Sequence, residues 1–279
     1  MKTKYLKKLS VAIAVVLSMV GFASSAYAGN IALTGHDDDF HQSLQAQAQV
    51  LGMLTFVDGG ILNTLLPVLT FDHGNELTSL LSTMGISYFN VDPNAGIPSP
   101  SLFDITKYSA IMVASDQSCG GCDNDSTSST NLASASSSFA SYFNAGGGIV
   151  GLAGASNSNY YNFLPLSASN PGIVFDSNAF TQTAAGLSNG ISAVNGDFPH
   201  NFFAFPGSGT DLAFQAMEVY SGSSSLGDLT NQPFTIAASG SVACTGLSCV
   251  ITPVPEPATI ALIGLGLAGF AASRKHKTI

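Results

Sequence analysis

Tyr108-Ser-Ala-Ile-Met-Val-Ala-Ser115 and Ile149-Val-Gly-Leu-Ala153 are two uncharged, mostly apolar runs on either side of a helical pattern in residues 129–144. Continuous apolar runs of this length are typical of strands buried on both faces of a parallel sheet. The apolar residues that recur at helical spacing between the two runs are Leu132, Ala135, Phe139 and Phe143. The pattern therefore predicts a strand, helix, strand crossover, the building unit of an α/β sheet.

Earlier segments repeat this alternation of strand and helix. Residues 30–34 and 86–91 read as strands, and residues 76–84 as a helix that Gly85 ends. Asp39 is expected to cap a helix that runs through residues 43–54. The side chains expected on one face of that helix are Leu44, Ala48 and Leu51. Together these patterns predict an α/β fold, a mostly parallel sheet with helices on both faces.

Beyond Ser156 the periodicity weakens. Residues 171–175, 213–220 and 233–238 are candidate strands whose order in the sheet the sequence does not indicate. The segment 29–252 is long enough to bury one sizeable core, and no repeat of solenoid length divides it. One exported domain over residues 29–252 is the expectation.

The strand entered by Tyr108, the helix that ends in Asn144-Ala-Gly-Gly-Gly148 and the run Ile149-Val-Gly-Leu-Ala-Gly-Ala155 resemble the class I glutamine amidotransferase-like fold, including its trehalose-utilisation relatives. The opening Leu33-Thr-Gly-His36 is similar as well. The resemblance implies a nucleophilic cysteine in the sharp turn after this last strand. Here Ala153 stands at that position, so the glutaminase activity of that family is not expected.

The N-terminus carries an export signal. Four lysines within the first eight residues precede an uncharged run that extends from Leu9 to Phe22. Ala26 and Ala28 supply the small residues that a signal peptidase reads, with Gly29 as the first mature residue. Residues 1–28 are therefore predicted to be a cleaved signal peptide, with an uncleaved anchor as the alternative.

The C-terminus combines a rigid turn, an apolar run and a basic end. Pro255-Glu-Pro257 precedes residues 258–273, which carry no charge, and a basic tail follows in residues 274–277. As a helix the apolar run reaches about 24 Å at 1.5 Å per residue, short of the ~30 Å hydrocarbon core of a bilayer. Because Lys and Arg remain in the cytoplasm, the pattern predicts a short transmembrane helix with the body outside.

Pro255, Glu256 and Pro257, the apolar run and then Arg274 and Lys275 resemble the PEP-CTERM sorting signal of exopolysaccharide-producing Gram-negative bacteria. This resemblance, over residues 253–279, implies export across the inner membrane, a transient anchor there, and cleavage by an exosortase near Pro-Glu-Pro. It further implies release to the cell surface or the extracellular polysaccharide matrix. The alternative is an ordinary tail anchor with a proline at the start of its helix.

The body carries many acidic residues and almost no basic residues to balance them. Lys107 is the only Lys or Arg between Leu9 and Ser273, whereas nearly all of the seventeen acids lie in the body. A surface of this charge repels phosphate backbones, which excludes nucleic acid as an expected partner. It is compatible with divalent cations and with neutral polysaccharide, and it also serves solubility alone.

The four cysteines form two local pairs, Cys119 with Cys122 and Cys244 with Cys249. In an oxidising compartment, close pairs of even number predict two disulfides. A redox motif of the Cys-x-x-Cys type and a zinc site that uses both pairs are the alternatives. The neighbouring Asp123 and Asp125 disfavour the thiolate that a redox motif requires.

Two imidazoles and three carboxylates lie within Gly35-His-Asp-Asp-Asp-Phe-His41. Carboxylates suit hard ions and imidazoles suit borderline metals, and ligand sites of α/β sheets lie where strands end. The candidate metal ligands are His36, Asp37, Asp39 and His41. The simpler interpretation is a solvated acidic turn that caps a helix, in which case the body needs no cofactor.

The remaining polar residues give weaker indications of function. The loop with Asp116 and Asp123-Asn-Asp125 lacks the glycine and the distal glutamate of a calcium-binding EF-hand. His200, beside Pro199, is expected to be a partly buried packing residue, and no Gly-x-Ser-x-Gly motif indicates a serine hydrolase. The first expectation is therefore a non-catalytic structural or binding body. The alternative is a metal-assisted hydrolase or sugar-modifying enzyme that uses His36, Asp37 and nearby carboxylates.

Overall fold

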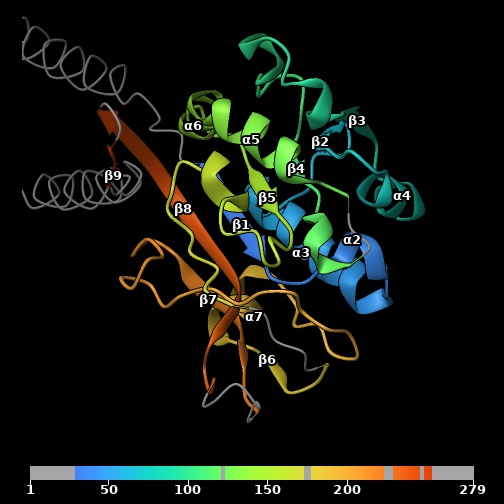
Figure 1. The fold of residues 1–279 in the computed structure, drawn as a ribbon, viewed down its shortest axis with the longest axis vertical. Coiled ribbons are helices and arrows are strands. Elements are labelled where there is room, and N and C mark those ends of the chain that lie inside the picture. The colour runs from blue at the N-terminus through green and yellow to red at the C-terminus, as the bar shows by residue number, and fades with distance from the viewer. Residues whose placement is uncertain (1–28, 121–122, 173–176, 223–228, 246–247, 253–279) are drawn as a thin grey trace, which may run out of the picture. The chain divides into compact units, whose positions relative to one another are not determined.

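The computed structural model describes residues 29–120, 123–172, 177–222, 229–245 and 248–252. Within these ranges nine strands form one sheet in the order β3-β2-β4-β5-β1-β8-β7-β6, with β9 paired to β8 (Figure 1). The strands are β1 (Gly29–Thr34), β2 (Val68–Phe71), β3 (Tyr88–Val91), β4 (Ile111–Val113), β5 (Ile149–Gly151), β6 (Phe180–Gln182), β7 (Gln215–Tyr220), β8 (Pro233–Thr245) and β9 (Ser248–Thr252).

The sheet has two halves that join at β1. The first half, from β3 to β1, is parallel throughout. From β8 onward every pairing is antiparallel, and the long strand β8 contacts β1, β7 and β9 in turn. The expectation of a mostly parallel sheet thus holds for the first half only, because β6, β7, β8 and β9 pair antiparallel in succession along the chain.

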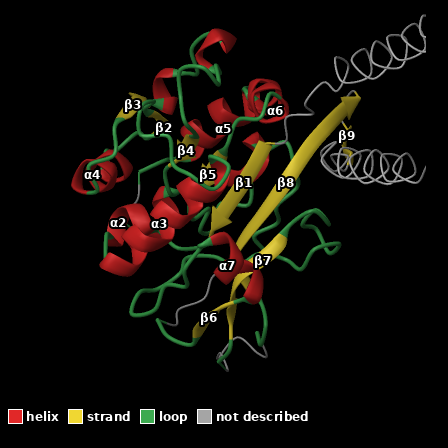
Figure 2. Cartoon of the chain, turned by 180° about the vertical axis from the view of Figure 1, so that it is seen from behind, coloured by secondary structure: helices red, strands yellow, loops and turns green. Residues whose placement is uncertain are grey.

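Helices cover both faces of the parallel half, as expected (Figure 2). On one face α5 and α6 pack over Ile31 and Leu33 of β1, and on the other α3 and α4 pack over Ala32. Successive strand residues point to opposite faces, so a strand covered on both sides must be apolar throughout. The helices are α2 (Asp38–His41), α3 (Leu44–Val57), α4 (Glu76–Thr83), α5 (Ser126–Ser134), α6 (Ser136–Asn144) and α7 (Ala184–Asn189).

The prediction for the helix after β1 was wrong in its start and in its buried face. The side chain of Ser43, not Asp39, caps α3 by accepting a hydrogen bond from the amide of Ala46. Leu44 is 83% exposed and Leu51 45%, whereas the buried apolar residues are Ala46, Val50, Met53, Leu54 and Val57. At Gly52 a Cβ would lie 2.3 Å from the carbonyl oxygen of Gly190, so this close backbone contact sets the rotation of the helix.

The helical pattern in residues 129–144 is confirmed, although the helix is divided. Leu132, Ala135, Phe139 and Phe143 are all buried in one cluster. Ala135 ends α5 and precedes α6. Of the later candidate strands, residues 213–220 and 233–238 correspond to β7 and β8. The candidate strand at 171–175 lies mostly outside the described residues.

Both targeting segments also lie outside the described residues: the expected signal peptide at 1–28, the Pro255-Glu-Pro257 turn, the expected membrane helix at 258–273 and the basic tail. Within the part that the structure describes, no helix has the length and apolar character needed to cross a membrane.

Candidate functional site

The turn after β1 carries the densest group of ionisable side chains. Asp37 occupies the position before α2, and His41 ends this helix one turn later. Residues four apart on a helix lie on the same side, and Asp37 Oδ2 is 3.3 Å from His41 Nε2. The short helix therefore presents a carboxylate and an imidazole to the same point in space.

The segment 199–201 brings a second imidazole to this point. His36 and Pro199 form an antiparallel bridge, and the amides of His200 and Asn201 both donate to the carbonyl oxygen of Gly35, at 2.6 and 3.1 Å. A Cβ on Gly35 would lie 1.7 Å from the carbonyl oxygen of Asn201, so only glycine permits this approach. As a result His200 Nε2 lies 3.2 Å from Asp37 Oδ2.

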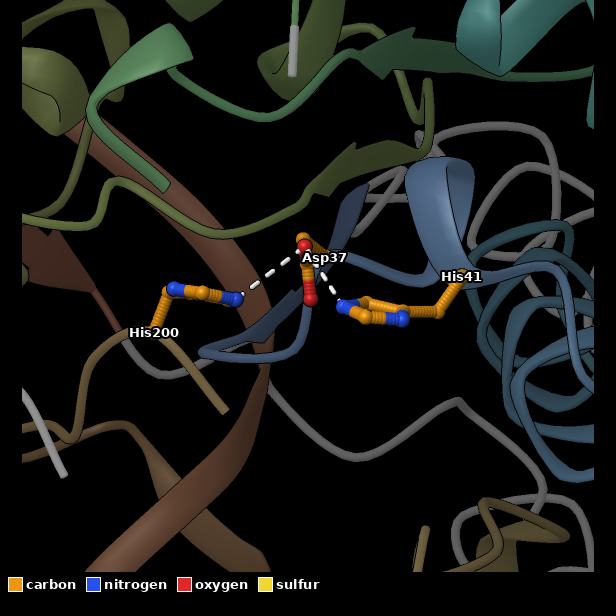
Figure 3. Close-up of side chains that lie close together, drawn as sticks. All are labelled: Asp37, His41 and His200. Atoms are coloured by element: carbon orange, nitrogen blue, oxygen red, sulfur yellow. Dashed lines mark ion pairs between the residues drawn. The ribbon is translucent and has the colours of Figure 1, made fainter. Parts of the chain in front are cut away.

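Figure 3 shows Asp37 between the two imidazoles, with His41 approaching from α2 and His200 from the opposite side. One donor atom from each residue lies within 4.8 Å of the other two. We call Asp37, His41 and His200 the His-Asp-His cluster. Asp37 is 2% exposed, His200 13% and His41 32%, so the cluster is open on the side of His41.

The residues of the His-Asp-His cluster shift one another's pKa values. Burial raises the pKa of Asp37, but hydrogen bonds from His200 and His41 outweigh it and leave the pKa below its ordinary value. The hydrogen bond with Asp37 raises the pKa of His41. His41 Nδ1 also lies 3.0 Å from Asp197 Oδ1. Both ring nitrogens of His41 therefore face carboxylates.

His36 and Asp39, two of the expected metal ligands, do not join the cluster. His36 Nε2 lies 3.2 Å from the buried Glu218 carboxylate. Glu218 also accepts from the amide of Val194 and the hydroxyl of Thr235. Burial raises the pKa of Glu218, but the charge and hydrogen bond of His36 help bring it below its ordinary value.

Asp39 connects α2 to the end of β4. Its carboxylate accepts from the amide of Ser115 at 2.7 Å and from the Ser115 hydroxyl at 2.6 Å. Because the carboxyl is fully buried, its pKa is raised to about 7. Burial, together with the nearby carboxylates, also raises the pKa of Asp38 well above its usual range. This turn is therefore a buried acidic centre and not a solvated one.

Sequence reasoning missed His200 as a member of this group. It is remote in sequence from Asp37, and the bridge between His36 and Pro199 that joins the two segments has no local signature. The available hints were weak: Pro199, which favours extended backbone at the preceding Phe198, and Asp197 three residues before His200.

The second acidic loop is organised by backbone caps. Asp116 caps a 3-10 helix (Gln117–Cys119), and Asp125 caps α5 by accepting from the amides of Thr127 and Ser128. The side chain of Asn124 donates to the carbonyl oxygens of Phe71 and Ala114 and accepts from the amide of His73. The polar side chains of this loop therefore cap helices or bond to backbone at the ends of β2 and β4.

The turn after β5 has its left-handed residue at Ala155, with φ 45°, and not at Ala153. Asn201 Oδ1 accepts from the amides of Gly154 and Ala155. A four-residue 3-10 helix (Tyr160–Phe163) follows in place of a long helix. Neither alanine carries a nucleophilic atom. The strand, turn and helix arrangement of a nucleophile elbow is therefore incomplete here.

An open groove of about 910 Å³ borders this turn. Its lining combines apolar residues, such as Leu164 and Leu166, with hydroxyl and amide side chains: Ser156, Ser158, Asn162, Ser167, Ser169 and Asn170. Asp211 is the one charged side chain among the described residues that line it. The groove is thus polar and nearly neutral, in contrast to the acidic centre around Asp37.

Three of the four cysteines lie among the described residues. Cys119 ends the 3-10 helix that Asp116 caps, while Cys122 lies outside the described residues. In the β8 and β9 hairpin the register sets Cys244 opposite Cys249. Directly opposed residues are the nearest neighbours on two antiparallel strands. The two disulfides remain predictions.

Comparison with protein-family models finds the PEP-CTERM protein-sorting motif at residues 253–275. No curated protein and no solved structure matched the chain. The motif includes the predicted sorting residues Pro255, Glu256 and Pro257 and the basic pair Arg274 and Lys275. Its presence supports exosortase-dependent sorting of an exported protein.

Proposed function

We propose that exosortase processing delivers this protein to the cell surface or the extracellular polysaccharide matrix, and that its body is a non-catalytic binding domain for neutral polysaccharide. The groove beside the β5 turn is the observation that carries the second part. Hydroxyl and amide groups exchange hydrogen bonds with sugar hydroxyls, and a nearly neutral lining does not select for a charged ligand. The neighbouring turn presents Ala155, which carries no nucleophile.

The proposed route has three steps. A signal peptidase cuts between Ala28 and Gly29, and the helix at 258–273 then holds the chain in the inner membrane with the basic tail in the cytoplasm. The exosortase recognises Pro255-Glu-Pro257 and cuts near it. The sequence features at both ends of the chain and the sorting motif support this route.

Mass spectrometry of surface material from the native host tests the route. We expect a chain that begins at Gly29 and lacks the segment after Pro257. Recovery of surface chains that are intact through Ile279 would contradict cleavage by an exosortase.

Affinity electrophoresis in gels that contain the neutral polysaccharide of the host tests the binding role. Ser158→Trp places a large ring at the lining of the groove, and Ser79→Trp places the same ring on the exposed face of α4 as the matched control. We expect polysaccharide to retard the wild-type chain and Ser79→Trp, but not Ser158→Trp. Equal mobility of all three in the presence and absence of polysaccharide would exclude the role.

A metal-assisted hydrolase or sugar-modifying enzyme is the second candidate, and the convergence of Asp37, His41 and His200 favours it. Release of new reducing ends from polysaccharide by the wild-type chain, and not by His200→Ala, would establish this function. It would also replace the non-catalytic one.

A further inference from the structure

We propose that Asp37, His41 and His200 bind one divalent transition-metal ion, that Zn²⁺ is the best chemical match, and that one coordination position stays open to solvent. This site is separate from the groove at the β5 turn. It can therefore exist whether or not the body binds polysaccharide.

The spacing of the donor atoms fits a metal ion. Asp37 Oδ2 lies 3.3 Å from His41 Nε2 and 3.2 Å from His200 Nε2. Ligands that sit about 2.0–2.1 Å from a tetrahedral zinc ion are separated from one another by roughly 3.3 Å. The carboxylate oxygen and each imidazole nitrogen thus already have the separation that two ligands of one ion require.

The orientation of His41 also fits. Its Nδ1 lies 3.0 Å from Asp197 Oδ1, as in metal sites where the distal nitrogen of a ligating histidine donates to a carboxylate. A protonated ring donates from both nitrogens, to Asp37 and to Asp197, whereas a metal ion in place of the Nε2 proton keeps the donation from Nδ1 to Asp197. A cation between Nε2 and the carboxylate of Asp37, either a proton or a metal ion, removes the repulsion between these electron-rich atoms.

Unpaired buried polar atoms occur on residues that flank the cluster in sequence. Among the described residues, three buried side-chain atoms have no hydrogen-bond partner: His36 Nδ1, Asp38 Oδ2 and Asn201 Nδ2. All three belong to residues next to Asp37 or His200 in sequence. Buried polar atoms are nearly always paired, and exceptions often mark a missing water or ion. None of the three atoms is among the donor atoms that converge at Asp37, and the side chain of Asn201 is directed at Gly154 and Ala155.

The charge balance favours a cation. Of the five carboxyl groups in the acidic centre, Glu218 pairs with His36 and Asp39 bonds to Ser115, while Asp37 and Asp197 both face His41. Lys107, the one lysine of the body, pairs instead with Asp104 at 3.4 Å. Among the described residues, no other Lys or Arg balances the carboxylates that face His41. Two imidazole ligands select a borderline transition metal over Ca²⁺ or Mg²⁺.

Zinc titration of the full-length chain tests the site. The chain is produced without a histidine tag, stripped with chelator and titrated with ZnCl₂ by calorimetry, and with Co²⁺ followed by its visible absorption. We expect one ion per chain at micromolar or tighter affinity. His41→Ala and His200→Ala should weaken binding at least about 100-fold, and Asp197→Asn about 10–100-fold, the range typical of partners that orient a ligand.

His73→Ala is the matched control, because His73 Nδ1 forms a similar 2.9 Å pair with Asp92 but belongs to no such cluster among the described residues. It should bind zinc like the wild-type chain. His41 is partly exposed at the end of a short helix, so its variant should fold, which thermal unfolding without metal verifies. Absence of zinc binding, equal binding by His41→Ala, or stronger binding of Ca²⁺ than of Zn²⁺ would overturn the proposal.

Discussion

Two acid-rich turns of this molecule resemble each other in sequence and differ in what their carboxylates contact. In the loop after β4, Asp116 and Asp125 accept from backbone amides at the starts of helices. In the turn after β1, Asp37 faces two imidazoles and Asp38 keeps an unpaired buried oxygen. The carboxylates of the first loop cap helices, whereas those of the second face imidazoles or lack a partner. The partners of a carboxylate, more than the density of carboxylates, thus distinguish a structural loop from a candidate site.

Asn124→Ala should give the largest loss of stability. The buried Asn124 side chain bonds to the amide of His73 and to the carbonyl oxygens of Phe71 and Ala114, and its removal leaves all three without this partner. The carbonyl oxygens of Phe71 and Ala114 keep the amide of Ala114 and the hydroxyl of Tyr160 as donors. The loss is therefore that of three hydrogen bonds at about 0.5–1.5 kcal/mol each, and we expect about 2–4 kcal/mol in urea unfolding. Asn162→Ala, at an exposed position, should change stability by less than about 0.5 kcal/mol. Unchanged zinc affinity in Asn124→Ala would confirm that the two turns act separately.

Zinc should stabilise the turn after β1 by a smaller amount. An ion at a free concentration 100 times its Kd adds about 2.7 kcal/mol to the free energy of unfolding if it binds only the folded chain. We expect this gain in the wild-type chain and in Asp125→Ala, but not in His41→Ala. An equal gain in all three would place the ion elsewhere.

Asp125→Ala should cost about 1–2 kcal/mol, the usual effect of removing a helix cap. Its carboxylate accepts from the amides of Thr127 and Ser128 and from the side chain of Asn94. Chemical unfolding of this variant beside Asp104→Ala measures the loss. A loss of zinc affinity in Asp125→Ala would break the distinction between the two turns.

A further effect concerns pH. Burial, then a hydrogen bond with Asp72, raises the pKa of Asp123 from 3.8 to about 7. The folded chain therefore holds a proton that the unfolded chain releases above about pH 4. This contribution is fully present below pH 4 and is lost as the pH rises through 7.

Asp123→Asn replaces the titrating carboxyl with an amide that does not ionise. The difference in urea stability between pH 5 and pH 8 should therefore shrink relative to the wild-type chain. Asp211→Asn, in the groove, is the control and should keep the wild-type difference. A steeper pH dependence in Asp123→Asn would contradict the origin assigned to it.

Local patterns predicted the parallel half of the fold well. The two apolar runs around residues 129–144 became β4 and β5, and the face with Phe139 and Phe143 is buried as expected. The antiparallel half was not predicted, because the pairing of β8 with β1 depends on contacts between residues far apart in sequence. The rotation of α3 was missed for the same reason, since a contact of Gly52 with Gly190 sets it.

The candidate site was predicted in part. Asp37 and His41 lie four residues apart, and this local spacing is sufficient to place them together. His200 joins them through the bridge between His36 and Pro199, which no periodicity indicates. His36 and Asp39 lie in the same turn as Asp37 and His41 and carry equally suitable ligand atoms. Their engagement with Glu218 and Ser115 depends on strands that the sequence alone did not arrange.

Asn201 forms hydrogen bonds next to both candidate sites. Its backbone amide is bound to Gly35 beside the His-Asp-His cluster, and its side chain holds the amides of Gly154 and Ala155 at the edge of the groove. A displacement of this one residue is therefore shared by both sites. Thermodynamic coupling is reciprocal, so if zinc changes the affinity of a groove ligand by some factor, that ligand changes the affinity for zinc by the same factor. Asn201 is the residue through which such a coupling would pass.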